Sequence, residues 1–554
     1  MWDKSESKRA MAEFPVRLIH ESFAAEYAAR PATLDVRALS QGDFEQLPPT
    51  YHNHPVTRAK GKYSSPLGYF SDAIPHTKKD SFFVFFWTSL VEGPAATRHL
   101  TCTLRMSDLC QCGCRGQCTF RAVSKIIVWS FNALASGKWP DKRHDGIPLD
   151  EARARREGPL AEGLAGALVE MRADLLEFTG ALGFKNWDDK LHPCFVCAAT
   201  LADMYNWPTS IETLVWALKD MAKYMAEVQA ATVAIRVDAA QLALLKTKLT
   251  TDHPRGMTGL GLAEDLPALG LQRGSVLVVD GSLADLRDIW ALEAPADLLF
   301  FRNHDNHSLN FLCVLFDIVG FTPQCLALDV MHVFDLGVVQ WLVATVFHVL
   351  IEGDAFESGR MYAVGKRLQG MIGLNKRIQA YYRSMGPRQR GRASRIGRLT
   401  SKMLGPSSAP ALRAKAAESR HLLDLAAQLT VEHNSLFNHG PMKFLPRACV
   451  ELQGFYKVMS ASPRRLSPEA LRRMRQHITM FLVCWGKSGG HFYPKHHMAW
   501  HIAQRADELG NPRFYHTYAD EGENRAMAKV AKAVHGSRDS FYKSVLQRVI
   551  PEAA

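Results

Sequence analysis

The pattern of hydrophobic and polar positions divides the chain into a mixed first part and a longer helical part. Residues 99–106 (HLTCTLRM) alternate polar and apolar side chains, which indicates a strand, and residues 120–135 repeat apolar side chains at helical spacing. Residues 166–178 (GALVEMRADLLEF) fit either a strand that ends in an acid or a short helix. The order strand, helix, strand predicts a mixed α/β core.

Helical periodicity dominates from about residue 205 to residue 490. The expected helices, with one strand-like apolar burst at 274–280 (GSVLVVD), cover residues 211–231, 239–249, 330–351, 421–433 and 468–485, and a closing helix covers 520–548. We therefore expect four regions: an irregular N-terminal region (1–90), the first part of an α/β core with Cys-rich segments (91–204), a mainly helical insertion (205–490), and a His motif with a closing helix (491–554).

The composition is that of a large soluble globular chain. With 554 residues, 47% hydrophobic and 22% charged, the chain is neither disordered, collagen-like nor a disulfide-stapled miniprotein. The N-terminus MWDKSESKRAMAEF lacks the apolar stretch of a secretory signal, and the apolar run 337–351 is too short to span a bilayer. We therefore expect an intracellular chain with reduced cysteines and no membrane partner.

The formal charge of +12 is concentrated in two segments. Residues 386–420, rich in Gly, Ser and Pro and low in apolar residues, hold nine basic residues and one acid, and are predicted to be an exposed basic arm; residues 464–475 hold five basic residues and one acid. Neutralisation of DNA phosphates, a nuclear-import signal and a solvated face all fit this pattern. The candidate DNA-binding residues are Arg388, Arg390, Arg392, Arg395, Arg398, Arg464, Arg465, Arg472 and Arg473.

Two cysteines and a group of histidines are spaced like zinc ligands. Cys194 and Cys197 form a CxxC pair, which can share one tetrahedral metal ion but leaves two ligands to be supplied. In PKHHMAWHIAQ, His497 and His501 share a helix face, whereas His496 would pair with His501 only if the helix began between them. The pattern predicts a structural Zn²⁺ site; the alternative is a chance CxxC and a surface group of histidines.

A second group of cysteines is more closely spaced. The run CxCxCxxxC contains Cys110, Cys112, Cys114 and Cys118, and the alternate spacing strains a tetrahedral chelate. A second zinc site and a structural loop without metal both fit this run.

Three acids are candidates for metal-dependent phosphoryl transfer, which needs carboxylates from separate parts of a fold. Asp108 follows the first expected strand, Asp174 lies in the second, and Glu521 opens the closing helix. Asp280 in VVDGS is a rival with an Asp-Gly pair, but it follows Asp174 in the chain. Asp520 and Glu523 flank Glu521, and a helix points these three side chains in different directions.

The order of these features resembles the RNase H-like DDE transposases, within them the CACTA/Tnp2 type and the related catalytic subunit of the V(D)J recombinase. The segment DLLEFTGALGFKNWDDKLHPCFVC is similar to the Tnp2 stretch that leads from an Asp to a CxxC, and LDVMHVFDLG resembles its DxMH stretch. The segments SDLCQCGCRGQCTF and GNPRFYHTYADEGEN resemble transposon-derived proteins of dinoflagellates. One departure is that Asp108 precedes Leu, where the Tnp2 family usually has Asp-Gly.

The resemblance implies an α/β fold with an RNase H-like core, interrupted by a large mainly helical insertion and carrying zinc-binding elements. It implies DNA strand cleavage and strand transfer with Mg²⁺ or Mn²⁺ held by Asp108, Asp174 and Glu521. It also implies Zn²⁺ held by Cys194, Cys197, His496 or His497, and His501. The expected partners are transposon ends and further copies of the chain, in the nucleus.

The DxMH stretch places Asp329 and His332 in the insertion, just before an apolar helix, where a helix-start carboxylate and a core histidine would have a structural role. Two other functions remain open for the chain. One is an inactive or domesticated transposon derivative that contains zinc and binds DNA without cutting it. The other is a zinc-dependent interaction protein without nucleic-acid chemistry.

Overall fold

The structure is a computed structural model that describes most of the chain outside a central gap. The described residues are 2–3, 8–9, 14–75, 77, 80–110, 116–156, 158–180, 193–201, 204–205, 216–224, 226, 233–237, 275–279, 313–356, 362–387, 394–534 and 538–549. Its contacts divide the chain into two compact units. The first unit is Met1–Leu201, Trp216–Ala327 and Tyr518–Ala554, and the second is Ala202–Val215 and Leu328–Thr517.

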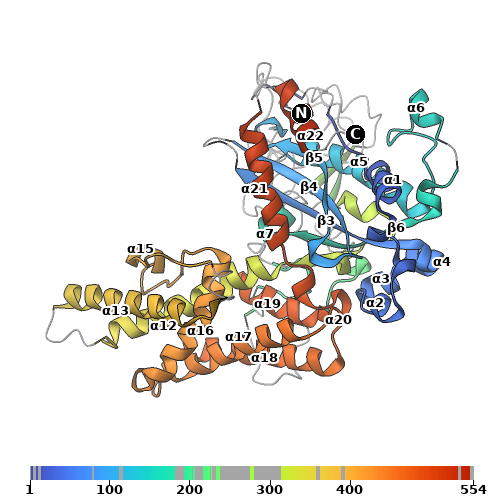
Figure 1. Cartoon of the computed structure of the whole chain (residues 1–554). Coiled ribbons are helices and arrows are strands. Elements are labelled where there is room, and N and C mark those ends of the chain that lie inside the picture. The colour runs from blue at the N-terminus through green and yellow to red at the C-terminus, as the bar shows by residue number, and fades with distance from the viewer. Residues whose placement is uncertain are drawn as a thin grey trace. The chain divides into compact units, whose positions relative to one another are not determined.

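A five-stranded mixed sheet forms the core of the first unit (Figure 1). Its strands lie in the order β5-β4-β3-β6-β9, with β3 antiparallel to β4, β4 antiparallel to β5, and β3 parallel to β6. The strands are β3 (Ser64–Pro75), β4 (Ser81–Ser89), β5 (Arg98–Arg105), β6 (Ala165–Ala173) and β9 (Leu326–Leu328). The chain is therefore a mixed α/β protein.

Helices cover both faces of this sheet. On one face, α5 (Gln117–Ser136) packs its Phe131 ring against Tyr69 of β3, and α1 (Ile19–Ala29) packs beside α5. On the other face, α21 (Tyr518–Lys532) and α22 (Arg538–Val549) contribute Met527 and Phe541 to a cluster with Phe70 of β3. This second pair of helices comes from the end of the chain, so the first unit is completed only by its last residues.

The remaining elements of the first unit are short. They are α2 (Gln41–Glu45), α3 (Pro49–Asn53), α4 (Pro55–Lys60), α6 (Glu151–Ala154) and α7 (Leu175–Gly180), with the two-stranded pairs β1 (Trp2–Asp3) with β2 (Lys8–Arg9) and β7 (Val233–Val237) with β8 (Ser275–Val279).

The second unit is helical. After a π-helical segment at Met331–Val338, it contains α12 (Val339–Glu352), α13 (Ala363–Ser384), α15 (Ser401–Leu404), α16 (Ala416–Glu432), α17 (Leu445–Ala461), α18 (Pro468–Lys487), α19 (Pro494–Gln504) and α20 (Ala506–Leu509). Within the described residues, one helical stretch, Met331–Glu352, is long and apolar enough to cross a membrane, and 72% of its most apolar window is buried inside the protein. This burial is also expected of the core helix of a helical bundle.

The expectation that residues 1–90 are irregular is wrong. They contain α1 and the two strands β3 and β4, which lie at the centre of the sheet. Because helices cover both faces of the sheet, these strands (SSPLGYFSDAIP and SFFVFFWTS) are buried along most of their length, at successive residues and not at alternate ones. Such strands lack the alternation of polar and apolar residues that marks a half-exposed strand.

Several other predictions are confirmed. The strand at 99–106 is β5, the helix at 120–135 is α5, and the segment 166–178 contains both proposed elements, with strand β6 followed by helix α7. The strand at 274–280 is β8, and the closing helix is two helices, α21 and α22. The helices expected at 330–351, 421–433 and 468–485 are also present. The predicted helix 239–249 lies outside the described residues. Within 211–231 the structure describes 216–224 and 226, where residues 221–224 are helical but residues 216–220 are not, since Leu218 forms a β-bridge with Cys197.

The basic arm is not an exposed linker where it is described. Ile396 and Leu399 are buried, and the backbone of Leu399 both donates to and accepts from the side-chain amide of Asn375 on α13, at 2.8 and 2.9 Å. Leu404 and Leu412 are also buried. The arm is therefore packed onto the helical unit, which holds its exposed arginines in place.

A buried histidine on α1 makes the stability of the first unit sensitive to acid. His20 lies against Ser130 of α5, with Nδ1 2.8 Å from the hydroxyl, and burial lowers its pKa to about 4. The unfolded chain has the ordinary histidine pKa of about 6.5, so between these values it binds more protons than the folded chain. Stability contributed by neutral His20 is therefore present above about pH 6.5 and is lost as the pH falls towards 4.

We expect His20→Gln to weaken this acid sensitivity. Between pH 7 and pH 5 the wild-type protein should lose about 2 kcal/mol more stability than the variant, as measured by urea unfolding at the two pH values. Between pH 7 and pH 8 the two curves should run parallel. Equal acid sensitivity of the two proteins would contradict the assignment.

Candidate functional site

Two aspartates lie at the same end of two neighbouring strands, Asp72 near the end of β3 and Asp174 directly after β6. Phe70 of β3 pairs with Arg172 of the parallel strand β6, and Asp72 and Asp174 each follow two residues later. Neighbouring strands are about 4.8 Å apart, and residues two apart point to the same face. Because the two strands are parallel, both aspartates lie at the same end of the sheet, on adjacent strands.

A third carboxyl group lies beside these two. The Asp174 carboxylate accepts a hydrogen bond from the Glu177 amide at 2.6 Å, at the start of α7, and the Glu177 carboxyl accepts one from the Ser71 hydroxyl. Burial raises the pKa of Glu177 well above its ordinary value; Ser71 partly offsets this, and the charges of Asp72 and Asp174 raise it further. This arrangement concentrates negative charge where β3 and β6 end.

Helix α21 brings its polar residues onto the same strands. The Asn524 amide donates to the Asp72 carboxylate at 2.6 Å, and Asp520 is fully buried against two arginines. Glu521 is partly buried, whereas Glu523 is exposed. At 3.6 residues per turn, Glu521 lies about 60° around the helix from Asn524, and Glu523 about 100°. Of the two glutamates, Glu521 is therefore nearer to the face that meets Asp72.

Asp108 lies elsewhere. It follows β5 at the edge of the sheet, where it is buried and accepts a hydrogen bond from the Tyr542 hydroxyl at 2.6 Å. Strands β4 and β3 separate β5 from β6, so the ends of β5 and β6 are roughly 14 Å apart. The structure does not bring Asp108 to Asp174, and Asp72 occupies the neighbouring position instead. The rival Asp280 lies outside the described residues.

Asp72 and Asn524 were not among the residues singled out from the sequence. The signal that could have identified Asp72 is an acid inside the otherwise apolar run GYFSDAIP, because a buried strand rarely carries a charged side chain without a partner or a function. Asn524 follows Glu521 by three residues, a spacing that puts both on one side of a helix.

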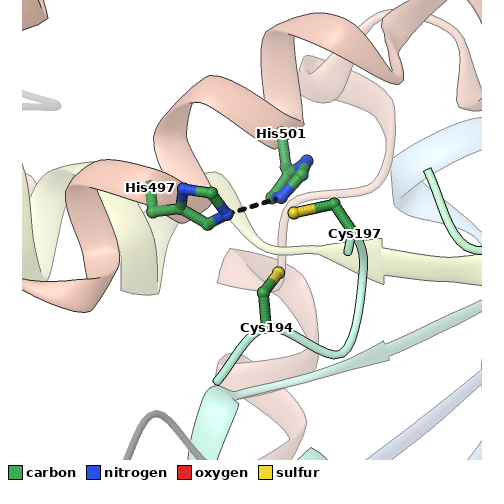
Figure 2. Close-up of side chains that lie close together, drawn as sticks. All are labelled: Cys194, Cys197, His497 and His501. Carbon is green, nitrogen blue, oxygen red and sulfur yellow. Dashed lines mark hydrogen bonds between the residues drawn. The ribbon is translucent and has the colours of Figure 1, made fainter. Parts of the chain in front are cut away.

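The predicted zinc ligands converge. Cys194, Cys197, His497 and His501 are buried, and their ligand atoms all lie within 4.8 Å of one another. Figure 2 shows the two thiols and the two imidazoles turned towards a common point, with the Nε2 atoms of the histidines 3.0 Å apart. A tetrahedral zinc site with bonds of about 2.0 Å to nitrogen and 2.3 Å to sulfur needs ligand atoms about 3.3–3.8 Å apart. The group therefore fits one zinc ion.

Groups around these ligands also suit a metal. The amides of Val196 and Ala199 point at the sulfurs of Cys194 and Cys197, at 3.3 and 3.4 Å. The other ring nitrogen of His497 lies 3.2 Å from the Met204 carbonyl oxygen, a contact that leaves Nε2 available as a ligand. Burial raises the pKa of the Cys197 thiol, so binding of zinc as a thiolate complex would release a proton.

His496, the alternative ligand, has a different role. Its Nδ1 accepts a hydrogen bond from the Tyr493 amide at the start of α19, and its ring stacks on Trp341 and Trp485, with centroids 5.0 and 5.5 Å away. Burial lowers its pKa to about 3. His496 therefore fixes the start of the helix that carries His497 and His501.

Asp329 and His332 lie near the start of the long segment of the helical unit, Leu328–Thr517, and Asp329 bonds to Thr517 at its end. Asp329 accepts hydrogen bonds from the His332 amide at 2.9 Å and from the amide and hydroxyl of Thr517 at 2.9 and 2.7 Å. Burial opposes ionisation, but the bonds from His332 and Thr517 prevail and lower the pKa of Asp329 to about 2. The carboxylate thus links the segment after β9 to the residue just before α21.

The second group of cysteines cannot be placed. Cys110 is buried, and its amide donates to the Thr119 hydroxyl at 2.9 Å. Cys112, Cys114 and the side chain of Cys118 lie outside the described residues. A metal site there stays a prediction.

The basic residues fall into two classes. Arg395, Arg398, Arg465 and Arg473 are exposed. Arg464 is buried over the Phe514 ring, 5.8 Å from its centre, and Arg472 pairs with Glu469 at 2.8 Å. Arg388, Arg390 and Arg392 lie outside the described residues. The segment 464–475 is therefore partly structural.

Comparison with known proteins gives no family. No protein-family model matches the chain, and no curated protein matches it. The function must be argued from the site itself.

Proposed function

We propose that the chain is a DDE transposase-like enzyme that cleaves and joins DNA strands, with Asp72, Asp174 and Glu521 as ligands of Mg²⁺ or Mn²⁺. The observation that carries the proposal is the parallel pairing of β3 and β6, which puts Asp72 and Asp174 at the same end of adjacent strands, with Asn524 of the helix that carries Glu521 bonded to Asp72. Asp72 takes the role expected of Asp108, because it is on the strand next to Asp174.

The order of the elements supports an RNase H-like core. An aspartate on an early strand is followed by a strand that leads into a second aspartate, then by CxxC, a helical insertion, two histidines on α19, and a glutamate on a helix. This is the order of the DDE transposases with the first acid moved to Asp72. The five-stranded mixed sheet with helices on both faces is compatible with that core.

The donor set fits a hard divalent cation, because carboxylate oxygens are the ligands that Mg²⁺ and Mn²⁺ prefer. Asp72 and Asp174 are close enough for their charges to raise the pKa of Glu177, and a cation bound between carboxylates relieves such repulsion. Metal ions bound there would polarise the scissile phosphate and lower the pKa of the attacking water or 3′-hydroxyl. Asn524 orients the Asp72 carboxylate, and the Glu177 amide orients that of Asp174.

The zinc group completes the proposal. Two thiolates and two imidazoles without an open position are typical of structural zinc. Cys194 follows Asp174 by 20 residues and His501 precedes Glu521 by 20 residues. Bound zinc would therefore join the segment that follows Asp174 to the segment that precedes Glu521.

The test is nicking of supercoiled plasmid DNA by the purified chain. We expect conversion to the open circle with Mn²⁺ and its loss with EDTA. DNA binding without cleavage under any divalent metal would instead support the inactive, DNA-binding alternative.

The exposed arginines of the basic arm should contribute to DNA binding through phosphates. Arg395, Arg398 and Arg413 are exposed. Replacing all three with Gln should reduce the steepness of the plot of log association constant against log salt concentration by about 2.7, or about 0.9 per lost phosphate contact. The measurement is fluorescence anisotropy of labelled duplex DNA between 50 and 200 mM salt.

A matched variant removes the same charge from another exposed surface. Lys142, Arg143 and Arg155 lie in the first unit, outside the arm, and are exposed. Their replacement with Gln should leave the slope nearly unchanged. Equal effects of the two triple variants would show that binding follows net charge alone.

A further inference from the structure

Four ionised side chains are buried together beside the proposed catalytic acids. Arg98 of β5 donates to the Asp520 carboxylate at 2.9 Å, and the Arg172 guanidinium of β6 lies 3.4 Å from the same oxygen. Glu170 lies 3.7 Å from Arg172 on the same strand. The side chains are between 0 and 5% exposed, so this ionic group, Arg98, Glu170, Arg172 and Asp520, is shielded from water.

Burying four charged side chains costs desolvation free energy, so each of them must lie close to a group of opposite charge. Charges taken out of water lose their hydration, and an unpaired one is strongly unfavourable in the protein interior. Here two positive and two negative charges balance. Because Asp520 bonds to Arg98 and lies within ion-pair distance of Arg172, its carboxylate ties α21 to both β5 and β6.

The ionic group joins parts of the chain that hold the proposed metal ligands. Asp520 precedes Glu521 by one residue, and Arg172 precedes Asp174 by two. Asp520 and Arg98 are 422 residues apart in sequence, so the contact fixes a late helix on an early sheet. A shift of α21 that broke the contact would also move Glu521 away from Asp174.

We infer that Asp520 is a positioning residue, which acts with Arg98 and Arg172 to hold Glu521 at the distance from Asp72 and Asp174 that a pair of divalent cations requires. This inference rests on the proposed function. It also assigns different roles to the adjacent acids: Asp520 is neutralised by arginines, and Glu521 remains to bind metal.

The experiment compares Asp520→Asn with the wild type in two measurements: the Mn²⁺ concentration that half-saturates plasmid nicking, and Mn²⁺ binding followed by electron paramagnetic resonance. The variant should need about 10- to 100-fold more Mn²⁺ in both, the loss typical when a group that orients a ligand is removed. At saturating Mn²⁺ most of the nicking rate should return. Asp520→Glu and Arg172→Lys keep the charges and should lie between the variant and the wild type.

A matched control separates positioning from general destabilisation. Glu451 of α17 is also a buried carboxylate between two basic groups, Arg447 and His477, but it belongs to the helical unit. Glu451→Gln should lower the thermal midpoint while the half-saturating Mn²⁺ concentration stays at the wild-type value. If Asp520→Asn fails to fold, the two charge-conserving variants still give the comparison.

Three outcomes would overturn the inference. An unchanged half-saturating Mn²⁺ concentration in a folded Asp520→Asn protein would show that α21 is positioned by other contacts. Complete loss of nicking at every Mn²⁺ concentration, as expected for a ligand, would make Asp520 itself a metal ligand. A wild-type chain that neither binds Mn²⁺ nor nicks DNA would overturn the proposed function, and the positioning role with it.

Discussion

Replacing Asp72 with Asn is expected to abolish Mn²⁺-dependent nicking, with a fall in rate of at least about 10³-fold, because a carboxylate that binds catalytic metal supplies charge that no amide can replace. Asp174→Asn and Glu521→Gln should have effects of the same size. The Asp72 variant should still fold, since an Asn at this position keeps an oxygen that can accept the hydrogen bond from Asn524.

The control is Asp108→Asn. Asp108 is an aspartate that, like Asp72, accepts a hydrogen bond from a side chain, here the Tyr542 hydroxyl, and it follows β5, three strands away from β6. We expect this variant to retain nicking within a few-fold of the wild type. If Asp108→Asn lost activity while Asp72→Asn kept it, Asp108 would be the first metal-binding acid, as the sequence suggested. The site proposed from the pairing of the strands would then be wrong.

Removal of the zinc ligands is expected to have the second large effect, on stability. The purified chain should contain one zinc per molecule from this site, measured by mass spectrometry of the metal, and Cys194→Ala or His501→Ala should lose it. The thermal midpoint should fall sharply, since structural zinc contributes about 10–16 kcal/mol of apparent binding free energy in small zinc-binding peptides. Treatment of the wild type with a strong chelator should have the same consequence.

Two control variants separate loss of zinc from other effects. One removes a buried cysteine outside the zinc group, and the other removes the histidine that is not a proposed ligand. Cys449 is a fully buried cysteine of α17 outside the group, so Cys449→Ala should keep the zinc and lose only the stability of a small cavity. His496→Gln should also keep the zinc, because His496 packs between tryptophans instead of facing the two cysteines. Zinc lost from His496→Gln and kept by His497→Gln would reverse the assignment of the ligands.

The zinc group was predictable because its information is local. A CxxC pair and two histidines one helical turn apart each fix a pair of ligands by spacing alone, and only the meeting of the two pairs required the fold. Asp174 and Glu521 were likewise predicted from short segments, one at the end of a strand and the other at the start of a helix.

The first acid of the proposed site, Asp72, could not be found in the same way. Asp108 and Asp72 both occur at or near the ends of strands, and the difference between them is which strand pairs with β6. That pairing joins residues about a hundred positions apart, which local periodicity does not encode. Strand β3 itself was also hard to recognise, because a strand covered on both faces lacks the polar and apolar alternation of a half-exposed strand.

The prediction that the basic arm is an exposed linker was wrong for a related reason. Its composition, rich in Gly, Ser, Pro and Arg, is typical of a linker, but four scattered apolar residues and the side chain of Asn375 hold it against helices. A few well-placed contacts outweigh average composition, since each buried apolar side chain contributes about 1.5–3 kcal/mol.

The contact between Asn524 and Asp72 spans 452 residues of sequence. At a synthesis rate of about 5–20 residues per second, the ribosome needs roughly 20 to 90 seconds between these two residues. During that time the strands with Asp72 and Asp174 have emerged, but the helix with Glu521 has not. A growing chain, or one that ends early, would therefore lack part of the proposed set of metal ligands. If the proposed function holds, the chain becomes able to cut DNA only when its translation is almost finished.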